Sequence, residues 1–139
     1  MTIRDESKEL SMILERGKCA WGRCYFCGWG KKEVKVSIDE LKRRLEGFLR
    51  KHSATGKIRK LKIFSSGSFL DEKQFPSEFV KFVVEAAERY GVEELVVESR
   101  PEFVTDDRLE LLKSSKVKVT VAMGLEIADD DILVNFYRK

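Results

Sequence analysis

The sequence lacks the long apolar segments that mark membrane and secreted proteins. No run approaches the roughly 18 apolar residues that a membrane-spanning helix needs. The first ten residues, MTIRDESKEL, contain no apolar core of signal-peptide length. With 42% hydrophobic residues the composition gives no sign of disorder, and no linker, low-complexity stretch or repeat divides the 139 residues. We therefore expect a single-domain, soluble, cytoplasmic protein that does not act at a membrane.

Cysteine and histidine are scarce, and their placement is informative. The chain has three cysteines and one histidine. Cys19, Cys24 and Cys27 cannot all pair with one another, and they lie too close in sequence for a disulfide framework. A metal site explains them better. With four and two residues between them, three thiolates can bind three irons of a [4Fe–4S] cluster, which leaves the fourth iron without a protein ligand.

Zinc is the main alternative for this site. The three cysteines and His52, the one histidine, would complete a tetrahedral set of four ligands. His52 is expected near the end of the first helix, about 20 Å along the axis from the helix start, near which the cysteines should lie. This separation favours the iron–sulfur cluster. A purely structural cluster with an external fourth ligand is a further alternative.

Short apolar runs alternate with helical periodicity four times along the chain. We expect strands at 12–14, 58–64, 95–98 and 117–123. We expect helices from Ser37 to a break at Thr55-Gly56, at 77–90, at 106–113 and from Asp129 to Lys139. Strands separated by helices indicate parallel pairing, so the fold class is α/β with about four βα units in an open, curved sheet. A closed eight-unit barrel takes about 250 residues, so this chain supplies only part of one.

Charge is unevenly distributed along the chain, although the net charge is only +3. Residues 31–62 contain 12 Lys and Arg against 4 Asp and Glu, which is a local charge of +8. Residues 71–110 contain 5 against 12, which is −7. This asymmetry fits either solvated helix faces that attract one another or a basic surface for a phosphate-rich partner.

The cysteine loop and three later stretches resemble a known superfamily. The loop resembles the signature of radical S-adenosylmethionine (SAM) enzymes, in which an aromatic residue, here Phe26, precedes the third cysteine. The spacing of the first two cysteines is one residue longer than is usual there. The stretches 63–71, 98–103 and 124–126 are similar to the radical-SAM subunit of archaeosine synthase. The resemblance implies that this chain is the N-terminal portion of a radical-SAM core, a partial (βα) barrel.

The resemblance also implies two cofactors, a [4Fe–4S] cluster on Cys19, Cys24 and Cys27 and SAM beside it. The residues expected to contact SAM are Phe26, Ser65, Ser66, Gly67, Ser68, Glu98, Arg100 and Glu126. In the superfamily the small-residue loop meets the SAM amino group. We expect Arg100 to meet the SAM carboxylate and Glu126 to accept from ribose hydroxyls.

Ordinary structural roles stay open for these residues. The loop 65–68 could be only a turn, and Glu98 and Arg100 could be only a local ion pair, although they end a parallel strand, where α/β sheets bind ligands. The aromatic side chains of Trp21, Tyr25 and Trp29 are expected to pack over the cluster and exclude water. The sequence indicates no catalytic side chain.

The function implied by the resemblance is reductive cleavage of SAM for tRNA nucleoside modification, of the archaeosine type that breaks a C–N bond. The implied partners are tRNA or a tRNA-modifying partner subunit, and an electron donor of the ferredoxin or flavodoxin type. The last strand would leave an unpaired edge, so we also expect self-association through it or covering by another chain. The alternative function is a non-catalytic iron–sulfur or zinc module.

Overall fold

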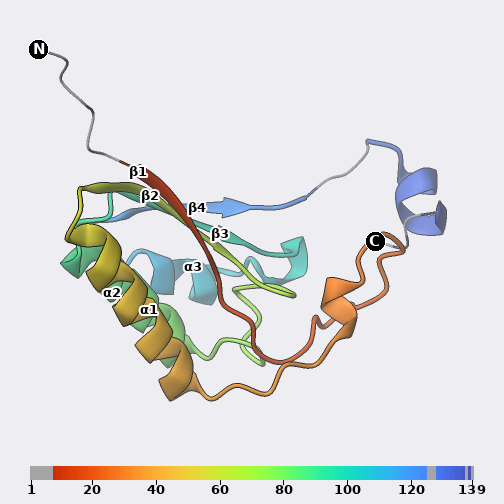
Figure 1. Cartoon of the computed structure of the whole chain (residues 1–139). Coiled ribbons are helices and arrows are strands. Elements are labelled where there is room, and N and C mark those ends of the chain that lie inside the picture. Colours follow the sequence, from red (N-terminus) through yellow and green to blue (C-terminus); the bar gives the residue numbers. More distant parts are fainter. Residues whose placement is uncertain (1–7, 125–127, 137, 139) are drawn as a thin grey trace, which may run out of the picture.

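The computed structural model describes residues 8–124, 128–136 and 138. Its centre is one parallel sheet with the strand order β1-β2-β3-β4 (Figure 1). The strands are β1 (Lys8–Ile13), β2 (Ile58–Phe64), β3 (Glu94–Glu98) and β4 (Lys118–Ala122). The α-helices are α1 (Ile38–Ser53), α2 (Ser77–Arg89) and α3 (Asp106–Leu112). Two 3₁₀ helices, η1 (Trp29–Lys31) and η2 (Pro101–Phe103), and a π-helix, η3 (Ile132–Phe136), complete the described elements.

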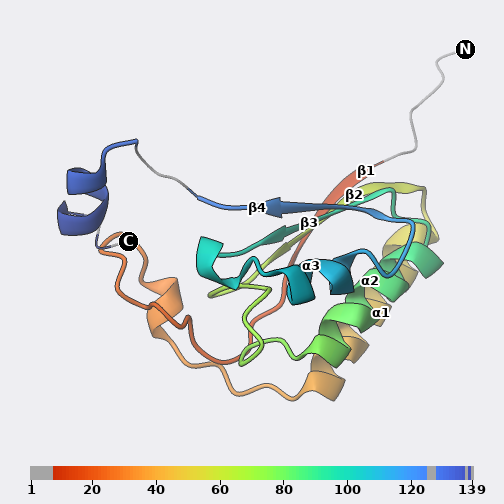
Figure 2. The same ribbon diagram turned by 180° about the vertical axis from the view of Figure 1, so that it is seen from behind.

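The three α-helices lie on one side of the sheet, as both views show (Figures 1 and 2). Each supplies the crossover that a parallel pair of strands requires. The core lies between the helices and the sheet, where the rings of Phe69, Phe75 and Phe79 pack with centroid distances of 5.3 and 5.7 Å. In the part of the chain that the structure describes, no helix is long and apolar enough to cross a membrane.

Local sequence explains where α1 begins and which face it buries. The Ser37 hydroxyl accepts a hydrogen bond from the Glu40 backbone N–H at 3.1 Å, which caps the helix as predicted. Leu41, Leu45 and Leu49 recur at the four-residue spacing of one helical face, and all three are fully buried. The apolar stripe of α1 therefore packs into the core.

Ion pairs link the basic and acidic halves of the chain. Lys42 on α1 lies 2.8 Å from Glu78 on α2, and Arg89 on α2 lies 2.6 Å from Glu46 on α1. Such surface pairs contribute only up to about 1 kcal/mol each. The Lys42–Glu78 pair joins a cation of the basic segment to an anion of the acidic one, as attraction between helix faces predicts, whereas in the Arg89–Glu46 pair the charges are reversed.

The sheet face opposite the helices carries a row of alternating charges. Glu9, Lys60, Glu94 and Lys118 are register partners across the four strands. The Lys60 amine lies 3.7 Å from a carboxylate oxygen of Glu9 and 3.7 Å from one of Glu94. This face is therefore polar near the amino ends of the strands, which is unlike a second apolar core.

The predicted fold class is confirmed, and the element bounds differ at a few places. β1 begins at Lys8, before the predicted residue 12, because its amino-terminal half pairs with β2 although it alternates polar and apolar residues. Pro101 opens the 3₁₀ helix η2, at a position where its missing N–H costs no hydrogen bond. The Asp129 side chain accepts from the Ile132 N–H at 3.2 Å, yet the helix that follows is a short π-helix.

Candidate functional site

The carboxyl ends of the four parallel strands meet at one edge of the sheet, and a cavity of about 370 Å³ lies there. Its walls come from the loops after β1, β2 and β3 and from the end of β4. The residues of the predicted site that line it are Cys19, Cys24, Phe26, Cys27, Ser65, Ser66, Gly67, Glu98 and Arg100. Residues predicted from separate motifs are thus brought together. This edge is where parallel α/β sheets bind their ligands.

The cysteine loop, residues 18–29, lies between Gly17 and Val34, which pair in a short antiparallel bridge. Gly17 donates to the Val34 carbonyl at 2.7 Å, and Val34 donates back at 2.9 Å. Gly17 has a φ of +70°, a conformation that glycine adopts without the cost of a side chain. Within the loop, the Cys27 N–H donates to the Cys24 carbonyl at 3.1 Å, and this turn brings those two cysteines together.

The thiols are arranged differently from the ligands of a single ion. Among the described residues, no group of three or more His, Cys, Asp or Glu side chains could hold one metal ion. A cubane binds each thiolate through a different iron, so its ligands lie farther apart than those of one ion. His52 packs its ring against Phe48 at 4.4 Å and does not line the cavity, so the geometry gives the zinc alternative no support.

The serine loop, residues 65–76, forms a buried wall of the cavity. Ser65, Ser66 and Ser68 are 6%, 4% and 2% exposed. The Ser66 hydroxyl is buried and has no hydrogen-bond partner among the described residues. A buried hydroxyl without a partner is costly, and a ligand that hydrogen-bonds it would remove that cost. Ser66 therefore fits a polar ligand in the cavity.

Ser68 lies behind the wall and joins two loops. Its backbone N–H donates to the Gln74 side chain at 2.9 Å, and its hydroxyl accepts from the Arg100 N–H at 3.0 Å. Ser68 is not among the residues that line the cavity, so its predicted contact with SAM stays a prediction.

Glu98 and Arg100 both line the cavity, but they are not paired with each other. Arg100 Nε donates to the Glu102 carboxylate at 2.6 Å, and its guanidinium lies 4.8 Å from the centre of the Trp21 ring. Burial raises the pKa of the Glu98 carboxyl. The alternative prediction, a local ion pair between Glu98 and Arg100, is therefore wrong, since Arg100 pairs with Glu102.

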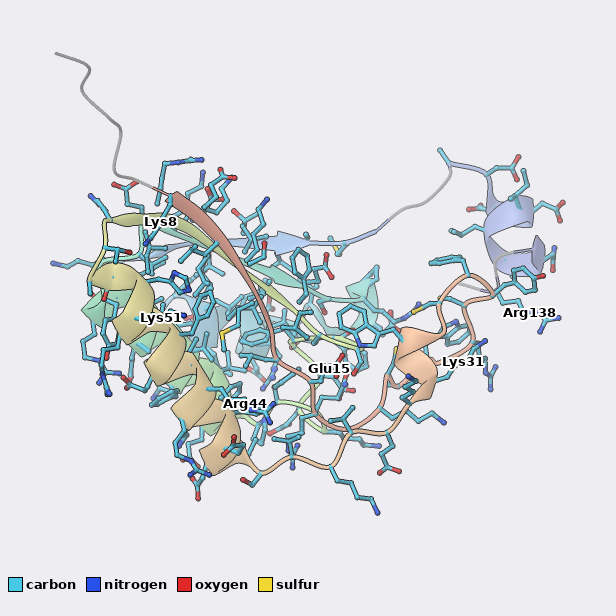
Figure 3. All side chains as sticks on the ribbon, in the orientation of Figure 1. Lys8, Glu15, Lys31, Arg44, Lys51 and Arg138 are labelled. Carbon is cyan, nitrogen blue, oxygen red and sulfur yellow. The ribbon has the colours of Figure 1, made fainter. Side chains whose placement is uncertain are left out.

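The aromatic residues of the cysteine loop differ in their surroundings. Trp29 lines the cavity and its ring N–H donates to the Glu15 carboxylate. Phe26 also lines the cavity although it is 51% exposed, and Tyr25 is 69% exposed. The Trp21 ring N–H donates to the Arg138 carbonyl at 2.6 Å, so the chain after η3 reaches the cysteine loop (Figure 3). Glu126, the last predicted SAM contact, lies outside the described residues.

Sequence reasoning missed Gln74, Arg16 and Met123. Gln74, in the second half of the serine loop, is 1% exposed and contacts both Ser68 and Arg16, the residue before Gly17. Neither side chain carried a signal, because each stands in a loop and belongs to no motif. Met123, which follows β4 and lines the cavity, was assigned only to a strand.

Comparison with known proteins gives the chain its relatives. It is 31% identical over 137 residues to archaeosine synthase subunit beta of Methanosarcina acetivorans, covering 91% of this chain and 39% of the relative. It is 34% identical over 117 residues to archaeosine synthase subunit beta of Thermococcus kodakarensis, covering 78% of this chain and 35% of the relative. The chain is a relative of the archaeosine synthase beta subunits. The relationship predicted from the motifs is confirmed.

A solved structure matches the fold. Queuine lyase from Clostridium spiroforme, determined with SAM and queuine bound, superposes with a TM-score of 0.67 at 20% sequence identity. The match covers 99% of this chain and 56% of that protein. The match confirms the predicted α/β fold, an open sheet of four parallel strands. No protein-family model matches the chain, and it spans well under half the length of the archaeosine synthase subunits.

Proposed function

We propose that this chain is a radical-SAM iron–sulfur protein that cleaves SAM reductively for tRNA nucleoside modification. The observation that carries the proposal is one cavity lined by three cysteines and by Ser66, whose buried hydroxyl has no hydrogen-bond partner in the described part of the chain. Descent from a common ancestor with archaeosine synthase subunit beta supports the choice of tRNA as substrate class.

Cys19, Cys24 and Cys27 would hold the [4Fe–4S] cluster. All three cysteines are partly exposed at the cavity, and none of them forms a disulfide. The turn between Cys24 and Cys27 and the Gly17–Val34 bridge hold the loop by backbone hydrogen bonds. When bound, a reduced cluster and SAM together supply a 5′-deoxyadenosyl radical, which is chemistry that protein side chains lack.

The opposite wall of the cavity would hold SAM. Ser66 offers a hydroxyl that can donate and accept. Arg100 offers guanidinium N–H groups beyond the one that Glu102 accepts, and these can bind a carboxylate. Glu98 offers an acceptor for an amine or a hydroxyl. Phe26 and Trp29 supply apolar surface on the cysteine side, where they would help to exclude water.

The chain would act with partners and with further parts of a barrel. We propose that it is one domain, the N-terminal portion of a radical-SAM core. The relatives are named as subunits and are more than twice as long as the matched region, which supports a partner subunit and additional strands. An electron donor of the ferredoxin or flavodoxin type would reduce the cluster.

Anaerobic reconstitution tests the proposal. After incubation with iron and sulfide, we expect about four irons per chain, the content of a [4Fe–4S] cluster. Calorimetry should then detect SAM binding to the reconstituted protein. A chain that takes up one zinc and no cluster, or that holds a cluster and binds no SAM, would support the non-catalytic module instead.

A further inference from the structure

A buried glutamine lies where the walls of the cavity meet. Gln74 is 1% exposed, and both ends of its amide are used. Its oxygen accepts from the Ser68 N–H at 2.9 Å, and its nitrogen donates to the Arg16 carbonyl at 2.9 Å. One side chain of the serine loop therefore holds Ser68, near the start of that loop, and also the segment that leads into the cysteine loop.

Arg16 returns the contact. Its guanidinium donates to the backbone carbonyls of Lys73 and Gln74, at 3.1 and 2.7 Å. Each of the two side chains thus binds the backbone of the other residue. The next residue, Gly17, forms the bridge with Val34 that closes the base of the cysteine loop. The reciprocal pair therefore fixes that base against the serine loop.

Gly67 shows how closely the glutamine approaches the cavity wall. A Cβ atom added to Gly67 would lie 2.1 Å from Gln74 Oε1 and 2.8 Å from both Cδ and Nε2. All three nearest atoms belong to Gln74. A glycine at this position is thus required by the glutamine amide rather than by backbone conformation.

The same contacts extend to the third loop. Ser68, whose N–H is held by Gln74, accepts from the Arg100 N–H through its hydroxyl at 3.0 Å. The Phe69 N–H donates to the Glu98 carbonyl at 2.9 Å. A shift of the serine loop would therefore move the backbone that carries Glu98 and Arg100.

We propose that Gln74 is a positioning residue that holds the serine loop and the cysteine loop at a set separation before either cofactor binds. The proposal rests on the proposed function. It assigns Gln74 no contact with SAM or the cluster. The polarity of the Gln74 amide is essential, because the site needs an acceptor facing Ser68 and a donor facing Arg16.

The main variant is Gln74→Met, which keeps an unbranched side chain of similar length and removes both hydrogen bonds. We expect SAM to bind about tenfold more weakly to the reconstituted variant, in line with the loss of a buried hydrogen-bonding pair, while cluster content stays near that of the wild type. Leu112→Ala is the control, because Leu112 is buried in α3 and does not line the cavity. It should lower the melting temperature and leave SAM affinity within about twofold of the wild type.

Amide hydrogen exchange gives a readout that needs no cofactor. In Gln74→Met the amides of Ser68, Gly17 and Val34 should exchange faster, while core amides of β2 and β3 should keep their protection. Gln74→Glu keeps an acceptor for Ser68 and loses the donor for Arg16 when ionised. In Gln74→Glu, hydrogen exchange should therefore speed up more at the amides of Gly17 and Val34 than at the amide of Ser68.

A double-variant cycle tests the geometry directly. Gly67→Ala should lower the melting temperature because its methyl group meets the amide. Gly67→Ala combined with Gln74→Ala should melt close to Gln74→Ala alone. Additive effects in this cycle, or wild-type SAM affinity and exchange in Gln74→Met, would overturn the proposal. A wild-type protein that binds no SAM would instead refute the proposed function, and the exchange and the cycle would still decide the role of Gln74.

Discussion

The two loops that face each other across the cavity are built in different ways. In the serine loop, Ser65, Ser66 and Ser68 are at most 6% exposed. In the cysteine loop, Phe26 is 51% exposed, and all three cysteines are partly exposed. The protein core therefore determines the shape of one wall, whereas the other wall is more open to solvent and, under the proposed function, would be organised by the bound cluster. Such a division is expected when metal binding supplies part of the free energy of folding.

Arg108 shows how firmly the serine loop is held. It is 7% exposed and donates to the carbonyls of Leu70 and Phe75, both at 2.8 Å, and to the Ser77 hydroxyl at 3.1 Å. Burial lowers the pKa of its guanidinium, and the charges of Glu72 and Asp71 oppose that change. Gln74, which directly precedes Phe75, adds the contacts with Ser68 and Arg16, so both groups of hydrogen bonds hold the same loop.

The largest effect should come from removing one of the proposed cluster ligands in the cysteine loop. In Cys24→Ala two thiolates remain, too few to hold a cubane, so we expect loss of the cluster absorbance and of bound iron after anaerobic reconstitution. Ser66→Ala is the matched change in the opposite wall. It should leave iron content at the wild-type level. A Cys24→Ala protein with the full cluster absorbance would refute the ligand assignment.

The second-largest effect should come from the edge of the sheet at β4. β4 is the last strand of the sheet, and a groove of about 270 Å³ beside it is lined mostly by apolar residues, Leu109, Leu112, Val117, Val119 and Val121 among them. An unpaired edge with such a groove favours association. We therefore expect the chain to self-associate through β4, or to be covered by another chain, and to form 5′-deoxyadenosine only at a slow background rate.

Light scattering and anaerobic 5′-deoxyadenosine assays check this expectation together. Val117→Lys puts a charge into the groove and should shift the chain toward monomer. Ser114→Lys adds the same charge at an exposed position outside the groove and should not. A monomeric wild type with many turnovers on a tRNA substrate would show that four βα units are sufficient.

Arg100 contacts both walls of the cavity, so substituting it tests whether they act together in SAM binding. It follows β3 and its guanidinium lies over Trp21 of the cysteine loop. If it binds the SAM carboxylate, Arg100→Ala should weaken SAM binding by about 1.5 to 3 kcal/mol, the range for a charged hydrogen bond. Arg100→Lys should restore only part of this, since a forked guanidinium becomes a point charge. Calorimetry that finds unchanged SAM affinity in Arg100→Ala would leave Arg100 only its contacts with Glu102 and Trp21.

The sequence predicted the features of the fold that depend on local patterns. The start of α1 after Ser37 and the strand β2 at 58–64 follow from capping chemistry and side-chain periodicity, and both were predicted correctly. The motifs also indicated which loops would meet, because parallel strands bring their carboxyl ends to one edge. The Gln74–Arg16 pair could not be predicted, since its 58-residue separation is closed only by the tertiary fold. The same is true of the choice of Glu102 over Glu98 as the partner of Arg100.

The smallest effect concerns the two glutamates near Arg100, Glu98 and Glu102. Their contributions to folding stability should depend on pH with opposite signs. Burial raises the pKa of Glu98. For Glu102, burial also raises the pKa, but the hydrogen bond and charge of Arg100 outweigh it, so the net shift is downward. A carboxyl with a raised pKa binds more protons in the folded state than in the unfolded state. Its contribution to stability is therefore present at low pH and is lost as pH rises through the folded pKa.

Glu98→Gln should consequently stabilise the metal-free protein at neutral pH, and it should lose that advantage as pH falls through the raised folded pKa of Glu98 toward about 4.3, the ordinary pKa of a glutamate carboxyl. Glu102→Gln should do the opposite. Its contribution is present above the unfolded pKa and is lost as pH falls through the lowered folded pKa, so the variant should be less stable than the wild type at neutral pH. Denaturant unfolding of both variants across this pH range measures the difference, which should be small because both groups retain solvent contact. If Glu98→Gln and Glu102→Gln changed stability with the same sign at neutral pH, Glu98 would not be the desolvated carboxyl, and the cavity would offer its ligand an already hydrated acceptor.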